Sequence, residues 1–244
     1  MGGRLVPRKN LRVEEVKDGR AARSGETRAK MIREAIEVFA ALGYQGASTR
    51  TLAEKAGVNL AAIPYHFGGK RELYLAAALT IANYARERMA PVVARLRDAD
   101  WADQITRIDE ALSSFIDLVV GSSHPEAWIS FFVRCEHDAD DAFRMIYEES
   151  VGRFERALTE AVAQTIGCDA GDESLRIRVA IVLASIANFR TLRNLTLSTL
   201  GWDQLNPDRL EQLNKAIRQF ALRELLSAPA QVVSASREAN PQSK

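Results

Sequence analysis

The chain has 244 residues, 47% of them hydrophobic, and its 33 Lys and Arg nearly balance 32 Asp and Glu, a composition typical of a soluble globular protein with a buried core. Helix formers dominate, Gly and Pro are few, and no long run alternates apolar with polar residues, so the predicted fold class is all-α. No apolar stretch approaches the roughly 18 residues of a membrane span. Cys135 and Cys168 lack metal-like spacing and are expected to be reduced structural thiols.

The first 23 residues are basic and contain few large apolar side chains, which predicts a disordered arm. Such an arm could follow a DNA backbone, enter a minor groove, or serve solubility alone. It lacks the apolar segment of a signal peptide, so a cytoplasmic location is expected.

A helix is predicted from Ser24 or Thr27, either of which can cap it, to Gly43, which ends it. Its apolar residues recur at i, i+3, i+4 and i+7 and mark one buried face: Ile32, Ala35, Ile36 and Phe39.

Two short helices joined by a tight turn are predicted between Ser48 and Lys70. Ser48 or Thr49 can cap the first helix, and Gly57 suits the left-handed residue that ends it. Asn59 can cap the second helix, in which apolar residues at spacings of three and four predict a buried stripe of Leu60, Ile63 and Phe67. Two such helices form a helix-turn-helix, whose second helix can enter the major groove of DNA, about 12 Å wide.

Residues 27–74 resemble the N-terminal domain of TetR/AcrR-type transcriptional regulators. The resemblance rests on Gly43-Tyr44, Gly46, Thr49-Arg50, Leu52-Ala53, Ala56-Gly57-Val58, Tyr65-His66-Phe67, Lys70 and Leu73. More loosely, Trp128 with the Phe-rich run after it, and Leu200-Gly201-Trp202, resemble the C-terminal domain of one branch of that family. The resemblance implies a three-helix DNA-binding domain followed by a larger helical domain for effector binding and dimerisation.

The charge distribution agrees with DNA binding by the N-terminal part. Residues 1–70 carry 13 Lys or Arg and 7 Asp or Glu, a net charge of +6, whereas the remainder carries 20 and 25, a net charge of −5. This split is expected if only the first part meets polyphosphate. A solvated basic tail is the alternative.

Nine residues are predicted at the DNA interface: Ser48, Thr49, Arg50, Asn59, Ala61, Ala62, Tyr65, His66 and Lys70. Thr49, Tyr65 and Lys70 would contact phosphates, and Arg50 could reach guanine O6 and N7. Ala61 and Ala62 could touch a thymine methyl or allow close approach. Asn59 is a cap first and a DNA contact second, and His66 either packs or contacts a phosphate. Pro64 leaves the side-chain directions after it open.

From Lys70 a longer helix is predicted to reach Leu96, with a bend near Pro91. It would connect the two domains and act as a lever between an effector site and the DNA-reading helices. Further helices are predicted at 102–120, 125–137, 141–166, 172–200 and 207–226, and a disordered tail at 229–244. The predicted domains are thus 24–70 for DNA binding and 71–228 for effector binding and dimerisation.

Aromatic side chains concentrate in the middle of the second domain and are candidate walls of an effector site: Trp128, Phe131, Phe132, Phe143 and Tyr147. Arg134, Arg190 and Asn194 are candidate polar contacts for the ligand. Packing in the core is the alternative for the aromatic residues, and surface or interface pairing is the alternative for the polar ones.

The helices at 172–200 and 207–226 are predicted to form a symmetric dimer interface. Leu210, Leu213, Ile217 and Phe220 make a narrow apolar seam, and Ala184 permits close approach on the other helix. A monomeric core is the alternative.

No catalytic motif is present, and Cys135, His137 and the acidic residues near them lack the geometry of a metal site. We therefore expect no metal, no cofactor and no enzymatic activity. The function favoured is a homodimeric repressor that a small molecule releases from a palindromic operator. The alternatives are a constitutive DNA-binding dimer without effector, and an all-α enzyme or metal sensor.

Overall fold

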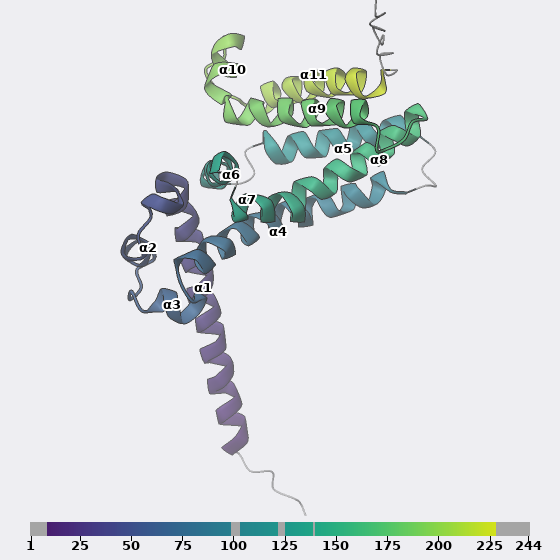
Figure 1. Cartoon of the computed structure of the whole chain (residues 1–244). Coiled ribbons are helices and arrows are strands. Elements are labelled where there is room, and N and C mark those ends of the chain that lie inside the picture. Colours follow the sequence, from purple (N-terminus) through teal and green to yellow (C-terminus); the bar gives the residue numbers. More distant parts are fainter. Residues whose placement is uncertain (1–8, 99–102, 122–124, 139, 228–244) are drawn as a thin grey trace, which may run out of the picture.

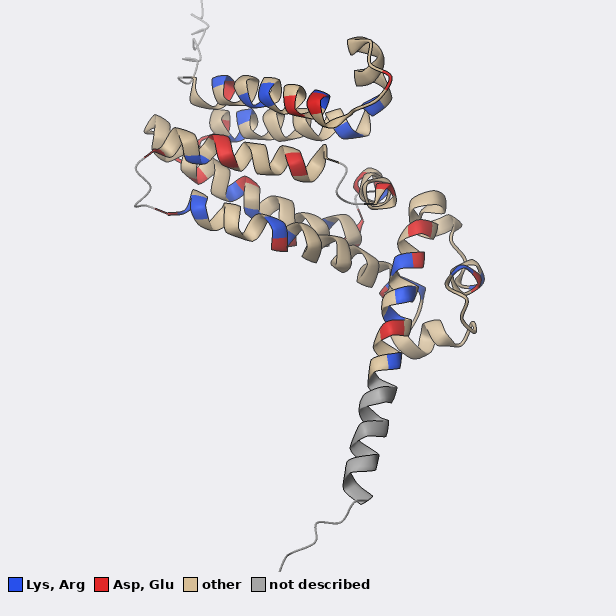
Figure 2. Ribbon diagram, turned by 180° about the vertical axis from the view of Figure 1, so that it is seen from behind, with Lys and Arg blue, Asp and Glu red and all other residues tan. Residues whose placement is uncertain are grey.

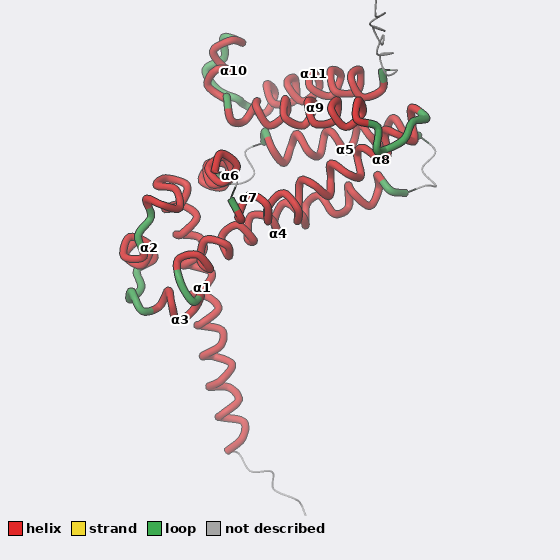
Figure 3. The backbone as a smooth tube through the Cα atoms, in the orientation of Figure 1, coloured by secondary structure: helices red, strands yellow, loops and turns green. Residues whose placement is uncertain are grey.

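The computed structural model describes residues 9–98, 103–121, 125–138 and 140–227, with side chains from Ala22 onward. Every regular element in these ranges is a helix, and none is a strand (Figure 3). The predicted all-α class is confirmed. None of the helices in the described ranges is long and apolar enough to cross a membrane.

The N-terminal part contains α1 (Lys9–Gly46), α2 (Thr49–Ala56), α3 (Ala62–Phe67) and α4 (Lys70–Leu96). The predicted disordered arm of residues 1–23 is corrected from Lys9 onward, because α1 begins there; residues 1–8 lie outside the described residues. Extending an existing helix avoids the cost of a new nucleus, and no proline interrupts residues 9–23. Gly43, the predicted helix end, has a non-helical backbone with φ of 71° and interrupts α1.

The second part contains α5 (Gln104–Val119), α6 (Glu126–Asp138), α7 (Asp141–Ile146), the π-helical turn η1 (Tyr147–Val151), α8 (Gly152–Ile166), α9 (Glu173–Thr191), α10 (Arg193–Leu200) and α11 (Pro207–Leu226). The helix predicted at 141–166 is continuous through the π turn. The helix predicted at 172–200 is instead two helices, because the backbone of Leu192 leaves the helical region, with φ of −103° and ψ of 34°. The predicted tail at 229–244 lies outside the described residues.

The second part is a layered bundle (Figure 1). Helices α9 and α11 form the outermost layer, α5 and α8 lie beneath them, and α4 runs along the opposite side. Helix α10 turns away from the end of α9, and none of its residues is buried. Pro91 lies inside α4 without ending it, because the helix continues to Leu96.

Two separate apolar cores hold the molecule together. The C-terminal core joins the second half of α4 to α5, α8, α9 and α11, with Leu112, Phe154 and Ile186 at its centre. The N-terminal core contains residues from α1, α2, α3 and the first half of α4, but also Phe131 and Cys135 of α6 and residues of α7. Residue 70 is therefore no boundary in the packing, since α6 and α7 share a core with the helices before it.

Candidate nucleic-acid interface

Helix α2 begins and ends as its sequence predicts. The hydroxyl of Ser48 accepts a hydrogen bond from the backbone N–H of Thr51 at 3.0 Å and so caps the helix. Gly57 ends the helix in the left-handed conformation, with φ of 64°. Leu52, Ala53 and Ala56 are buried, so the opposite face of α2 is turned to solvent.

The turn into α3 is built by Asn59. Its side-chain oxygen accepts from the N–H of Ala61 at 2.9 Å, and its carbonyl accepts from the N–H of Ala62 at 2.8 Å. Asn59 therefore caps this turn, as predicted, although the regular helix begins only at Ala62. Pro64 is the third residue of α3, where the missing N–H is one of those that no helical carbonyl would bind. The proline therefore does not break the helix.

The solvent-facing side of α3, together with the turn before it, exposes several largely apolar side chains. Tyr65 is 83% exposed, and Ala61 and Pro64 are also exposed. His66 is half-buried and meets the ring of Tyr65 edge to face, with 4.9 Å between centroids. Tyr65, Ala61 and Pro64 are thus accessible from solvent on this face of the helix-turn-helix.

The prediction that Leu60 is buried is wrong, and the sequence pattern did not identify Leu60 as a residue of the exposed surface. It was predicted in the buried stripe with Ile63 and Phe67, yet it is 52% exposed, whereas Ile63 is 1% exposed. Leu60 precedes α3 within the turn and so does not share the helical face that its spacing suggests. The position of Leu60 in the turn before α3 was the sequence feature that could have indicated its exposure. Leu60 is thus a further candidate for apolar contact with a base.

Arg50 projects from α2, with 83% of its side chain exposed. Its Nε donates to the carboxylate of Glu54 at 2.9 Å, one turn further along the helix. A surface pair of this kind contributes only about 0.3–0.5 kcal/mol, so a guanine or a phosphate can displace it. Ser48 is also exposed and Thr49 is half-buried, so the start of α2 is accessible.

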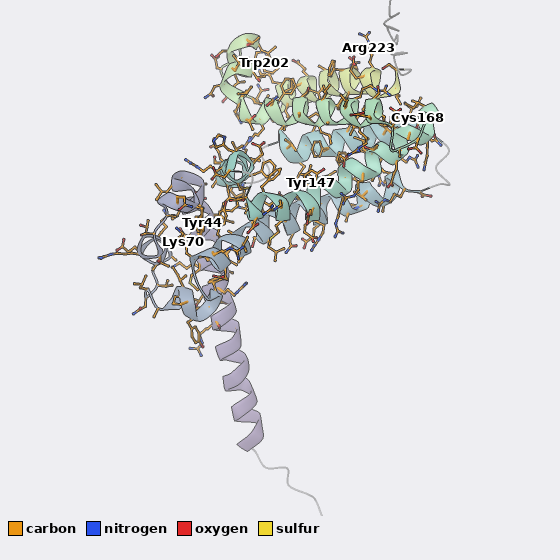
Figure 4. All side chains as sticks on the ribbon, in the orientation of Figure 1. Tyr44, Lys70, Tyr147, Cys168, Trp202 and Arg223 are labelled. Atoms are coloured by element: carbon orange, nitrogen blue, oxygen red, sulfur yellow. The ribbon has the colours of Figure 1, made fainter. Side chains whose placement is uncertain are left out.

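Lys70 has a structural role inside the domain. Its ammonium group donates to the backbone carbonyl of Ala47 at 2.8 Å and lies 4.3 Å from the ring centroid of Tyr44. Figure 4 shows Tyr44 and Lys70 side by side. An ammonium group has three donors, and Ala47 uses one of them, so Lys70 can hold the loop before α2 and still donate to a phosphate.

Basic residues of α1 extend the charged surface toward α3. The guanidinium of Arg28 lies 4.8 Å from the ring centroid of Phe67, a cation–π contact that joins the two helices. Figure 2 shows Lys and Arg positions along α1 and on α2. Arg28 was not predicted as an interface residue; the basic excess of residues 1–70 was the only signal.

Polar contacts fasten α6 and α7 to this domain. The guanidinium of Arg134 donates from Nε to the carbonyl of Ala40 at 2.6 Å and from Nη2 to the carbonyl of Ala41 at 2.8 Å. These carbonyls belong to the last turn of α1 before Gly43. Arg71 at the start of α4 pairs with Asp141 at 2.6 Å. Hydrogen bonds from Arg144 and then from Arg71 lower the pKa of the Asp141 carboxyl.

The predicted effector residues fall into two groups. Phe131 is 1% exposed and packs against Phe39 and Tyr74 in the N-terminal core. Trp128 meets Tyr84 edge to face at 5.0 Å, and Phe143 lies between Phe132 and Tyr147, with centroids about 6 Å away on each side. The aromatic residues therefore pack against one another where α4, α6 and α7 meet, although Phe131 alone of the five is buried, and their assignment to an effector site stays a prediction.

The polar residues of that prediction are brought together. Arg134, Arg190 and Asn194 line one cleft of about 610 Å³ between α6 and the α9–α10 corner. In the described residues, no group of three or more His, Cys, Asp and Glu could hold a metal ion.

The predicted dimer seam divides between the interior and the surface. Leu213 and Ile217 are 8% and 5% exposed and belong to the C-terminal core of the same subunit, and they also form the floor of a groove between α9 and α11, so their place in a dimer interface stays a prediction. Phe220 is 49% exposed, Ala184 is exposed and Leu210 is half-buried. Helix α9 also exposes Ile177 and Ile181, which lie on one stripe with Ala184.

Two short helices around a left-handed glycine, with an exposed second helix and a basic flank, define a helix-turn-helix DNA-binding protein. Residues 31–77 match the family model of bacterial regulatory proteins of the tetR family. Residues 104–228, more than half of the chain, match the C-terminal domain of the HTH-type transcriptional dual regulator CecR. The chain belongs to the TetR family of transcriptional regulators, and it is a DNA-binding regulator of that family.

Known proteins resemble the chain over most of its length. It is 27% identical to the HTH-type transcriptional dual regulator CecR of Shigella flexneri, over 79% of this chain and 88% of that protein. It is 28% identical to the transcriptional activator FasR of Mycolicibacterium smegmatis, over 66% of this chain and 69% of that one. The structure of Bacillus subtilis FadR in complex with stearoyl-CoA aligns with a TM-score of 0.56 at 15% identity, over 80% of this chain and 98% of FadR. This last likeness shows the shared fold.

Proposed function

We propose that the chain is a homodimeric repressor that reads a palindromic operator with α2 and α3 and leaves it when a small molecule binds the second part. The exposed recognition surface carries the proposal: the Arg50 side chain and Tyr65 are each 83% exposed, beside Leu60 and Ala61. Single exposed apolar side chains are common on proteins, but here they share the presenting end of a helix-turn-helix.

The proposed contacts follow from exposure. Arg50 would pair with guanine O6 and N7, and Tyr65 with Thr49 would hold phosphates. Leu60 and Ala61 would meet thymine methyl groups in the groove. Ser48 and Asn59 serve mainly as caps, which keep the two helices at a fixed angle, and Lys70 fixes the loop before α2 through Ala47.

The second copy would cover the outer face of α9 and α11. A groove of about 350 Å³ lies between these helices and is lined almost entirely by apolar side chains, among them Phe189 and Phe220. Exposed Ile177 and Ile181 extend the same surface along α9. A two-fold axis through this layer would place both helix-turn-helix units on one side of the dimer. Matching the DNA then requires about 34–36 Å between recognition helices, or a multiple of it.

The proposal of a small-molecule effector rests on the shared fold and on the position of α6. The structure of FadR was determined with stearoyl-CoA, and FadR shares this fold. In this chain α6 joins the second part to α1 directly, so a ligand beside α6 can favour one position of the helix-turn-helix over another. A constitutive DNA-binding dimer is the alternative, and it predicts no ligand that changes operator affinity.

Selection of duplexes from a random library by the immobilised full-length chain tests the DNA-binding proposal. We expect palindromic sites, with affinity that falls steeply with salt, by a log–log slope of about −0.9 for each phosphate neutralised. Recovery of no enriched sequence would contradict sequence-specific DNA binding. Recovery of single half-sites only would contradict binding as a dimer. Transcription from the recovered operator, with and without the protein, then decides between repression and activation.

A further inference from the structure

The cleft between α6 and the α9–α10 corner lies beside the end of α1. In Figure 1, α6 is seen end-on between the last turns of α1 and the point where α9 turns into α10. The cleft has a volume of about 610 Å³, and Ala40 of α1, Ser130 of α6 and Asn194 of α10 contribute to its lining. A ligand in this cleft would therefore touch both parts of the molecule.

The lining of the cleft is strongly unbalanced in charge. Three arginines, Arg134, Arg190 and Arg193, face it with a single carboxylate, Glu126. Within the described residues, Arg190 and Arg193 make no ion pair and no hydrogen bond through their side chains, although both are half-buried. Burial first, and the charge of Arg193 second, lower the pKa of Arg190, while Glu126 raises it. Removing three guanidinium groups from water with one carboxylate among them is unfavourable, and an anion between Arg190 and Arg193 would offset part of that cost.

The rest of the lining is apolar. Ile129 and Val133 of α6 face Leu192 and Leu195 at the α9–α10 corner. Leu192 and Leu195 are 50% and 62% exposed, so this corner offers apolar surface for a ligand to cover. A mobile inorganic ion would use the arginines and leave these side chains exposed.

We propose that this cleft binds an amphipathic organic anion, whose carboxylate or phosphate group lies between Arg190 and Arg193 and whose apolar body covers Ile129, Val133 and Leu195. This proposal names the chemical class of the effector. Its role in regulation rests on the function proposed above. Arginine suits the task because its planar fork can bind a carboxylate or a phosphate through two hydrogen bonds.

The same cleft reaches the DNA-binding domain through Arg134. This guanidinium forms part of the cleft wall and also donates to the carbonyls of Ala40 and Ala41 in α1. An anion held by Arg190 and Arg193 in the same cleft would attract the guanidinium of Arg134 away from these carbonyls, so binding would weaken the hold of α6 on the end of α1. The helix-turn-helix follows α1 after Gly43, and its position would change with the ligand.

Calorimetric titration of the full-length protein with decanoate, in the absence of DNA, tests the binding site. Decanol, which has the same chain and no charge, is the matched ligand control. We expect decanoate to bind more tightly than decanol to the wild type. The double variant Arg190→Gln with Arg193→Gln should bind decanoate about tenfold to a hundredfold more weakly, as expected for lost charge-assisted hydrogen bonds. Arg176→Gln, on an exposed part of α9, is the matched protein control and should bind like the wild type.

Thermal melting of the ligand-free variants shows whether a loss of decanoate binding results from misfolding. Because Arg190 and Arg193 repel each other, the double variant should melt at the same temperature as the wild type or higher. Equal affinity of the wild type for decanoate and decanol, or undiminished decanoate binding by the double variant, overturns the site. A chain that binds decanoate as expected but selects no DNA would leave the site standing and refute the proposed function instead.

Discussion

The hydroxyl of Tyr74 donates a hydrogen bond to the carboxylate of Asp140 over 2.7 Å and so joins α4 to the residue that precedes α7. Asp140 also caps α7, because it accepts from the N–H of Phe143 at 3.0 Å. The ring of Tyr74 packs against Phe39 of α1 and Phe131 of α6. One side chain thus touches the DNA-binding helices and the helices of the second part.

Tyr74→Phe should destabilise the protein by about 1.5–3 kcal/mol, since it removes a hydrogen bond to a charged acceptor and keeps the ring. Urea unfolding of the full chain, followed by circular dichroism, measures the change. Tyr147→Phe is the matched control, because Tyr147 is 37% exposed and its hydroxyl has no hydrogen-bond partner among the described residues. Equal stability of Tyr74→Phe and the wild type would show that the contact contributes little.

Alkaline pH should weaken the N-terminal core. Burial raises the pKa of the Cys135 thiol from 9.0 to about 12, and burial together with the hydrogen bond to Asp140 raises the pKa of Tyr74 above its ordinary value of 10.0. Raised pKa values mean that the folded state holds these protons more tightly than the unfolded state. The stabilisation is therefore complete below the ordinary pKa values and is lost as the pH rises above 9.

Melting temperatures measured from pH 7 to pH 10.5 test this dependence. We expect a decline that begins near pH 9 in the wild type and is smaller in a variant that combines Tyr74→Phe with Cys135→Ala. An identical decline in both proteins would assign the effect to other groups.

Arg50→Ala should reduce affinity for the selected operator by about 1–3 kcal/mol and relax one base position, if the guanidinium reads a guanine. Glu54→Gln is an informative companion, because it removes the partner that holds Arg50 at 2.9 Å in the free protein. That variant should bind DNA at least as tightly as the wild type. Anisotropy titrations on matched and single-base-changed duplexes separate the two effects, and unchanged base preference in Arg50→Ala would rule out direct readout.

Phe220→Glu should dissociate the proposed dimer and leave the subunit folded, because this side chain is 49% exposed in one subunit. Leu213→Glu should instead unfold the protein, since Leu213 lies in the C-terminal core and a charge placed there has no partner. Light scattering combined with circular dichroism distinguishes the outcomes. A wild-type chain that is monomeric at micromolar concentration, or a Phe220→Glu variant that remains a dimer, would contradict the α9–α11 interface.

Local features of the sequence predicted the helices well. Helix α4 runs from Lys70 to Leu96 as predicted, since Gly68 and Gly69 precede it and helix formers continue past Pro91. Helix α11 begins at Pro207 after Asn206, whose side chain caps it by accepting from the N–H of Arg209. Such signals act within one or two turns of helix, so one sequence suffices to detect them.

Features that depend on distant contacts were not predictable in this way. The sequence around Phe131 allows a pocket wall as well as a core residue until α1 and α4 are placed around it. Leu213 and Ile217 form an apolar seam in the sequence, but which neighbour covers the seam depends on the course of α5 and α9. The break at Leu192 carries no Gly or Pro, so the sequence around it gave no reason to divide the helix.

The sharing of the N-terminal core between α1–α4 and α6–α7 limits how this protein can be recombined with its relatives. A chimera joined at residue 70 would pack a foreign DNA-binding domain against Phe131, Cys135 and Ile146, which are side chains that fit the helices that were removed. Exchange of operator specificity is therefore better made by grafting the exposed residues of α2 and α3 alone, while the buried surface that the two parts share is kept.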